Sequence, residues 1–329
     1  ERGFYTCKKI ASIELPNSLR SLGRYAFGSC TNLKSVTIPG SVTDMQGNCF
    51  DRCENLETAI IEENVSDIGY GCFLLCKNLK TVVLPDTLNK ISGAAFSGCS
   101  NLSEITIPSG VKEISAAAFL ECSALKNVAI PENVEKIGSS AFSGCSSLTS
   151  ITIPASVKEI AAGLGGKAQI FNAFMNCRNL VALNVNSDNT VYASYNGCLY
   201  SQDMKILYFC PMGLENIVVP ETVAEIYRSA FYNENSTENS WKNIYFKGSA
   251  PDTSEYMPEM PVVTAYVPAD NTTWTTEKKA GYGNAVTWKT WQPSLNKCDI
   301  FLTTDSYVYD GKAKEPSVEV TGGYLKLTK

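Results

Sequence analysis

Residues 96–122 read FSGCSNLSEITIPSGVKEISAAAFLEC, and this stretch decides the fold. It begins with Phe96 and Cys99, and the same pair returns 23 residues later as Phe119 and Cys122. The residues that keep this step are Phe4, Phe27, Phe50, Phe73, Phe96, Phe119 and Phe142, and Cys7, Cys30, Cys53, Cys76, Cys99, Cys122 and Cys145. A fixed period of this length is typical of proteins in which each unit stacks on its neighbours. The sequence therefore predicts a repeat solenoid.

Each unit contains the pattern of a short strand followed by a turn. Residues 35–38 (SVTI) alternate polar and apolar side chains, as a half-buried strand does. Proline follows at 16, 39, 85, 108, 131 and 154, and Glu62 fills the remaining slot. Because proline has no N–H to donate, it ends the strand. A second extended segment follows around Val42, and the Ala-Phe-x-x-Cys-x-x-Leu spacing predicts a short helical turn that carries the phenylalanine inward.

The composition excludes several classes of chemistry. The 329 residues include no histidine, which removes His-dependent nucleophiles and His-ligated zinc. The net charge of -5 disfavours nucleic acid as a partner. There is no Cys-x-x-Cys motif, and no apolar run reaches the roughly 20 residues of a transmembrane helix. We expect no catalytic residue, no cofactor, no metal site and no transmembrane segment in this stretch of chain.

The thirteen cysteines are explained mainly by the repeat. Seven occupy the Cys slot, Cys177 joins them after an insertion, and Cys49 and Cys72 occupy the small Ala slot. Parallel neighbours about 4.8 Å apart are poorly placed for disulfides, so these residues are predicted to be buried structural thiols. Cys198 and Cys210 lie outside the repeat, and their redox state is left open.

Charged residues follow the same period on one outward face. Lys90, Glu113, Lys136 and Glu159 alternate in sign from unit to unit, and Lys112, Glu135 and Lys158 do so beside them. Side chains on adjacent strands lie close together, so this pattern predicts ion pairs on a solvated surface. A general-acid pair would require desolvated carboxylates, which this face does not offer.

A second outward row carries no charge and is the candidate partner-binding face. Its members are Thr37, Ile60, Val83, Thr106, Ala129 and Thr152. A rigid, weakly charged sheet surface suits contact with a protein or glycan. The alternative is that β-branched residues simply favour strands.

The 23-residue period is first interrupted by insertions and then lost after residue 232, and these changes predict the domain organisation. We expect a solenoid over residues 1–232, with a glycine-rich insertion around 162–167 and a β-hairpin island at about 186–216. Residues 233–293 hold all four tryptophans and are predicted to form an aromatic β-rich cap, with an exposed aromatic platform as the alternative. Residues 294–329 contain short strand-like segments separated by glycine turns, and we expect them to be the start of a further, truncated β-module. We also expect both ends of the sequence to be cut ends of a longer chain.

The unit Leu102-x-x-Ile105-x-Ile107-Pro108 through Ala118-Phe119-x-x-Cys122 resembles the BspA-like leucine-rich-repeat family of bacterial surface proteins. Residues 245–251 (YFKGSAP) resemble the cap of such arrays, and 307–318 resemble the start of a bacterial Ig-like module. This second resemblance implies that residues 294–329 are the start of a truncated Ig-like module. The resemblance implies a leucine-rich-repeat solenoid on the extracellular bacterial cell surface. It further implies a non-enzymatic adhesion function toward host matrix proteins, other cells or glycans, with a passive spacer as the alternative.

Overall fold

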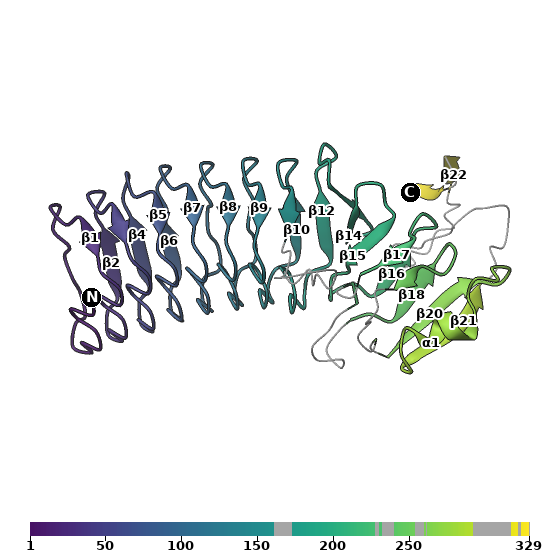
Figure 1. Ribbon diagram of the computed structural model, residues 1–329, viewed down its shortest axis with the longest axis horizontal. Coiled ribbons are helices and arrows are strands. Elements are labelled where there is room, and N and C mark those ends of the chain that lie inside the picture. The colour runs from purple at the N-terminus through teal and green to yellow at the C-terminus, as the bar shows by residue number, and fades with distance from the viewer. Residues whose placement is uncertain are drawn as a thin grey trace, which may run out of the picture.

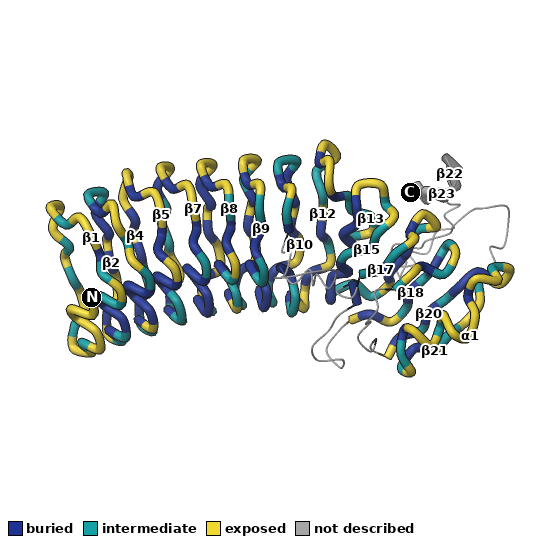
Figure 2. Tube along the Cα trace, in the orientation of Figure 1, coloured by how far each residue is buried: buried dark blue, intermediate teal, exposed yellow. Residues whose placement is uncertain are grey.

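The computed structural model describes residues 1–160, 173–227, 230–231, 240–253, 260 and 262–291, together with the backbone of residues 317–321 and 324–328. Its coils stack side by side along the long axis, and the C-terminal sheets lie at the far end from the N-terminus (Figure 1). Buried and exposed residues alternate along each coil (Figure 2). The glycine-rich insertion at 162–167 lies outside the described residues.

The repeats build two rows of parallel strands. The first row contains β2 (Ser35–Ile38), β4 (Thr58–Ile61), β6 (Thr81–Val83), β10 (Ser150–Ile153) and β12 (Ala182–Val185). The second row contains β1 (Ser21–Leu22), β3 (Asp44–Met45), β5 (Asp67–Ile68), β7 (Lys90–Ile91), β8 (Glu113–Ile114), β9 (Lys136–Ile137) and β11 (Glu159–Ile160). Partners in β2, β4 and β6 are 23 residues apart, as Ser35, Thr58 and Thr81 are. The sequence period is therefore the coil length.

The segment around each phenylalanine consists of tight turns, whereas the sequence predicted a short helical turn. Tyr25 and Ser29, which flank Phe27, have positive φ angles of 56° and 59°. A residue in that region interrupts a right-handed helix. The N–H of Phe27 donates to the carbonyl of Cys49 in the next coil (2.8 Å), whereas the N–H of Gly28 stays within its coil. Every second backbone N–H in this segment donates to the next coil instead of within its own, so no helix forms there. The predicted solenoid is confirmed, but its short helical turns are replaced by tight turns.

The phenylalanines form one continuous stack through the core. From Phe4 through Phe142 to Phe174, successive ring centroids lie 5.0–5.8 Å apart, and the ring planes differ by at most 11°. The inner members, such as Phe96, are fully buried. Each ring therefore depends on the coils on both sides, which couples the repeats energetically.

The cysteine slot has a bonding role beyond its small volume. The seven thiols of this slot from Cys30 to Cys177, which exclude Cys49 and Cys72, each donate to the carbonyl oxygen of the phenylalanine in the preceding coil, at 3.1–3.3 Å. The twelve described cysteines are all free thiols, and only Cys7 is not buried. The prediction of buried structural thiols is confirmed for the cysteines of the repeat except Cys7, which is half-buried.

The coiling pattern changes after β12. The segment predicted as a hairpin island holds β13 (Tyr192–Tyr195), β14 (Cys198–Ser201) and β15 (Ile206–Phe209), which pair antiparallel. Buried Asn189 joins this island to the preceding coil: its Nδ2 donates to the carbonyls of Pro154 and Val157, and its Oδ1 accepts from two backbone N–H groups. Parallel pairing then resumes.

The C-terminal part continues as two parallel ladders. One is formed by β15, β17 (Glu225–Ile226) and β19 (Asp252–Thr253), and the other by β16 (Asn216–Val219), β18 (Asn243–Phe246), β20 (Val263–Pro268) and β21 (Val286–Trp291). Parallel stacking thus runs on to residue 291, into the range assigned to the cap. The single described helix is α1 (Thr276–Ala280).

The aromatic side chains of this region mostly close a second core. Trp241 and Trp274 are buried, and their indole N–H groups donate to the carbonyls of Pro211 and Gly248. Phe246 packs against Trp274 and Tyr282. This packing favours a cap over an exposed platform.

The C-terminal strands β22 (Ser317–Thr321) and β23 (Tyr324–Thr328) pair antiparallel. Residues 292–316, where the Ig-like resemblance begins, lie outside the described residues.

Candidate functional site

The six candidate residues form one line of exposed side chains across the first row of strands. Thr37, Ile60 and Val83 are direct neighbours in the register of β2, β4 and β6. Thr106 and Ala129 continue the row where the sheet narrows to the bridge between Glu104 and Asn127, and Thr152 lies on β10. All six are exposed. The structure therefore brings together the residues that the sequence selected, without testing what they bind.

The alternation along each strand explains why this face is outward. In β2, Val36 and Ile38 are buried and Ser35 and Thr37 are exposed. The buried side chains belong to the core, and the exposed side chains project outward from the sheet. The backbone N–H and C=O groups of these strands are already paired with the neighbouring strands. The result is a face with fixed spacing and little freedom to rearrange.

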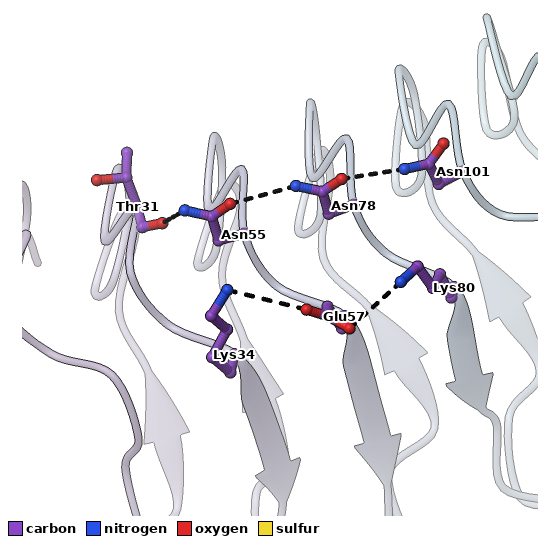
Figure 3. A network of polar contacts seen from close by, with 7 residues as sticks. All are labelled: Thr31, Lys34, Asn55, Glu57, Asn78, Lys80 and Asn101. Carbon is purple, nitrogen blue, oxygen red and sulfur yellow. Dashed lines mark hydrogen bonds and ion pairs between the residues drawn. The ribbon is translucent and has the colours of Figure 1, made fainter.

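One edge of this face, where the strands begin, is held by polar ladders (Figure 3). The side-chain amide of Asn55 donates to the carbonyl of Thr31, Asn78 donates to Asn55, and Asn101 donates to Asn78, at 2.7–3.2 Å. Glu57 lies between Lys34 and Lys80, at N–O distances of 3.8 and 3.3 Å (Figure 3). Charges on this edge are thus largely satisfied within the protein.

The opposite edge, where the strands end, is shaped by the proline turns and has two open depressions. The larger has a volume of about 610 Å³ and lies over the ends of β4 and β6, between Ile60, Val83 and the turn at Glu62. The smaller, about 420 Å³, lies beside Ala129, Thr152 and Glu132. Both adjoin the candidate row.

Glu62 and Glu63 at the larger depression were not selected as site residues from the sequence. Glu62 occupies a proline slot, and its carboxylate accepts a hydrogen bond from the N–H of Gly40 at 3.1 Å. Glu63 accepts from the N–H of Asp86 at 3.3 Å. The signal for Glu62 was the single departure from proline among the seven slots of the repeat.

The charge ladder on the second strand row has the predicted geometry. Asp67, Lys90, Glu113, Lys136 and Glu159 occupy successive positions in the register of β5, β7, β8, β9 and β11. The Nζ of Lys136 lies 2.9 Å from the carboxylate of Glu159. This pairing raises the pKa of Lys136. Both side chains are exposed to solvent, where an ion pair contributes little to stability and the carboxylate is not desolvated as a catalytic acid would be.

The cysteines are poorly suited to chemistry. Burial raises the pKa of the Cys53, Cys122 and Cys177 thiols to about 12. Thiolates are the reactive form, so these groups are inert at neutral pH. The sequence left the redox state of Cys198 and Cys210 open, and both are buried free thiols. Cys198 lies just before Leu199 and Cys210 just after Phe209, and Leu199 and Phe209 are partners in the β14–β15 hairpin.

Two further findings concern only the described part of the chain. No three His, Cys, Asp or Glu side chains there are grouped so that they could hold a metal ion. No helix in the same residues has the length and apolar character needed to cross a membrane.

Stacked 23-residue coils with a leucine, a strand and a turn in each define a leucine-rich-repeat solenoid. The family model of the BspA type leucine rich repeat region (6 copies) matches this chain over residues 1–126, 66–202 and 113–238. The chain belongs to the BspA-type leucine-rich-repeat family, as its sequence resemblance predicted.

Solved structures show the same fold. The chain is similar to a leucine rich cell surface protein from Faecalibacterium prausnitzii A2-165, with a TM-score of 0.55 and 22% identity over 82% of this chain and 83% of that one. It is also similar to a leucine-rich repeat protein from Bacteroides ovatus ATCC 8483, with a TM-score of 0.51 and 20% identity over 88% and 80% of the two chains. No protein with curated annotation matches the chain by sequence.

Proposed function

We propose that this chain is part of a non-enzymatic bacterial cell-surface protein. In this proposal it binds a host or neighbouring-cell protein or glycan through the row from Thr37 to Thr152, and so serves adhesion. Its extracellular location is supported by the family and by the cell-surface description of the F. prausnitzii protein. No cofactor, nucleic acid or metal enters this function.

The observation that carries the proposal is the contrast between the row and its surroundings. The row is uncharged and exposed on β2, β4, β6 and β10, whereas the second strand row carries alternating charges in register. Protein interfaces have few charged residues at their centres and more at their rims. An uncharged row with polar and charged residues on either side has that composition.

The test measures binding of the full chain to a panel of immobilised extracellular matrix proteins and to a glycan array. The variant is Ile60→Glu/Val83→Glu/Thr106→Glu, which places three carboxylates in the row. We expect at least about tenfold weaker binding of any partner found, because each carboxylate would have to be desolvated at the interface.

The matched control is Ser66→Glu/Asn89→Glu/Ala116→Glu, which adds the same charge at exposed positions outside the row. Equal binding by wild-type protein and a folded row variant would overturn the assignment of this face. Equal loss in both variants would also overturn it, because the effect would then come from net charge.

A rigid spacer is the second candidate function. The continuous ring stack from Phe4 to Phe174 favours it, because such a stack resists bending. The spacer function predicts that the folded chain binds no member of either panel.

A further inference from the structure

The feature that carries a further inference is the larger depression beside the proposed binding row. It lies where β4 and β6 end, with Ile60, Val83 and Leu84 as apolar lining and Glu62 and Glu63 at its rim. The inference rests on the proposed function and specifies the chemistry of the partner.

The lining of the depression is unusually apolar for this face. Ile60 and Val83 are 36% and 47% exposed and are adjacent in the register. The row carries threonine at Thr37, Thr106 and Thr152, so an apolar pair occurs at this place alone among the six positions. Covering these side chains would remove apolar surface from water, which favours an apolar group on the partner.

The turns along this edge are acidic. Residues 39–41, 62–64, 85–87, 108–110, 131–133 and 154–156 contain Glu62, Glu63, Asp86 and Glu132 but no lysine or arginine. None of these four carboxylates forms a salt bridge with another described residue. Arg20 comes near the depression, but its guanidinium donates to the carbonyl of Ser41.

The two edges of the face therefore differ in how their charges are used. On the edge where the strands begin, Lys34 and Lys80 share Glu57 (Figure 3). On the same edge, Lys77 pairs with Glu54. At the depression, Glu62 and Glu63 each bond a backbone N–H through one oxygen, which orients the carboxylate and leaves the second oxygen for a ligand. Fixed, uncompensated carboxylates beside an apolar lining complement a cation next to an apolar group.

We propose that the depression binds a protein segment in which an apolar side chain stands next to lysine or arginine. The apolar side chain contacts Ile60 and Val83, and the cation pairs with Glu62 and Glu63. A neutral polysaccharide would leave these carboxylates unpaired, so the charge pattern favours a basic protein segment as the occupant.

The experiment measures, by calorimetry with the full chain, the binding of three acetylated synthetic peptides that share glycine-serine flanks. Their central sequences are Arg-Leu-Arg, Glu-Leu-Glu and Arg-Gly-Arg. We expect binding of the first alone, with an affinity that falls as salt is raised because the ion pairs are partly exposed.

Two variants separate the contributions. Glu62→Gln/Glu63→Gln should weaken the Arg-Leu-Arg peptide about tenfold, and Ile60→Ser/Val83→Ser should weaken it by a similar factor. The matched control Glu121→Gln/Glu135→Gln removes two exposed carboxylates elsewhere and should leave the affinity unchanged.

The outcomes distinguish this inference from the proposed function. A matrix protein or glycan whose binding is lost in the Ile60→Glu/Val83→Glu/Thr106→Glu variant but unchanged in Glu62→Gln/Glu63→Gln would overturn the inference and leave the binding function standing. Equal binding of the Arg-Leu-Arg and Glu-Leu-Glu peptides would overturn it as well. Absence of binding in the peptide, protein and glycan panels would overturn both.

Discussion

The thiol of Cys99 donates a hydrogen bond of 3.2 Å to the carbonyl oxygen of Phe73, one coil earlier in the stack. The same carbonyl accepts the N–H of Cys76 within its own coil, also at 3.2 Å. The cysteine slot thus links adjacent coils through a side chain where the turn leaves a carbonyl facing the core. This contact explains why a small residue with a donor serves at this position.

Thiol reactivity should follow burial. Because burial raises the pKa of Cys122 to about 12, only about one thiol in ten thousand is ionised at pH 8. We expect iodoacetamide to modify Cys7 in the native protein and to leave Cys122 and the other buried thiols of the slot intact. Peptide mapping by mass spectrometry measures this, with the urea-unfolded protein as the fully reactive control. Modification of Cys122 as fast as Cys7 would contradict the packing.

Removal of one ring from the phenylalanine stack should be costly. Phe96 lies 5.6 Å from both Phe73 and Phe119 and is fully buried, so Phe96→Ala should destabilise the protein by about 3–5 kcal/mol. The comparison is Phe4→Ala, at a position that is 46% exposed and has one stacked neighbour, where the loss should be much smaller. Urea unfolding followed by circular dichroism measures both, and equal losses would show that the stack does not couple the coils.

The sequence was sufficient for the coil length, the buried ladders and the outward rows, because each follows from one period and from strand alternation. It was misleading at the turn around Phe27, where helical spacing of apolar residues is also compatible with turns through positive φ. Hydrogen bonds from one coil to the next, such as that from Phe27 to Cys49, leave no signature in a single unit. The acidic rim at Glu62 was visible only as a missing proline, since its contact with Gly40 depends on the stacking of two coils.

The buried amide of Asn189 offers a test of the junction between the solenoid and the hairpin island. Its Nδ2 donates to the carbonyls of Pro154 and Val157 at 2.8 and 2.9 Å. In Asn189→Asp a carboxylate oxygen would face these two acceptors, so its pKa in the folded protein should rise above its value in the unfolded chain. We expect a loss of more than about 2 kcal/mol at neutral pH.

The sign of the pH dependence follows from that raised pKa. The unfavourable carboxylate is neutralised below the folded pKa, so the Asn189→Asp variant should regain stability relative to wild type as the pH falls toward about 4. Thermal unfolding across this range measures the difference. Asn189→Ala carries no titrating group and should show a deficit that does not change with pH; a constant deficit in Asn189→Asp as well would refute the orientation of the amide.

Asp51 should destabilise the native protein at neutral pH. Its side chain is only 9% exposed, and its Oδ1 has no hydrogen-bond partner among the described residues, while Arg52 lies 3.8 Å from its Oδ2. Burial raises the pKa of Asp51, and the nearby guanidinium of Arg52 offsets that effect in part. A raised folded pKa means that stability is highest when the group is protonated and is lost as the pH rises through that pKa.

We therefore expect Asp51→Asn to stabilise the protein at pH 7 and to have little effect near pH 3, where both the folded and unfolded chains carry the protonated acid. Differential scanning calorimetry at the two pH values measures the change in melting temperature. Arg52→Gln is the informative companion: it removes the compensating cation and should lower the melting temperature at pH 7 but not at pH 3. If Asp51→Asn instead lowers stability at pH 7, the carboxylate must be paired in solution, and the burial of Oδ1 without a partner would be wrong.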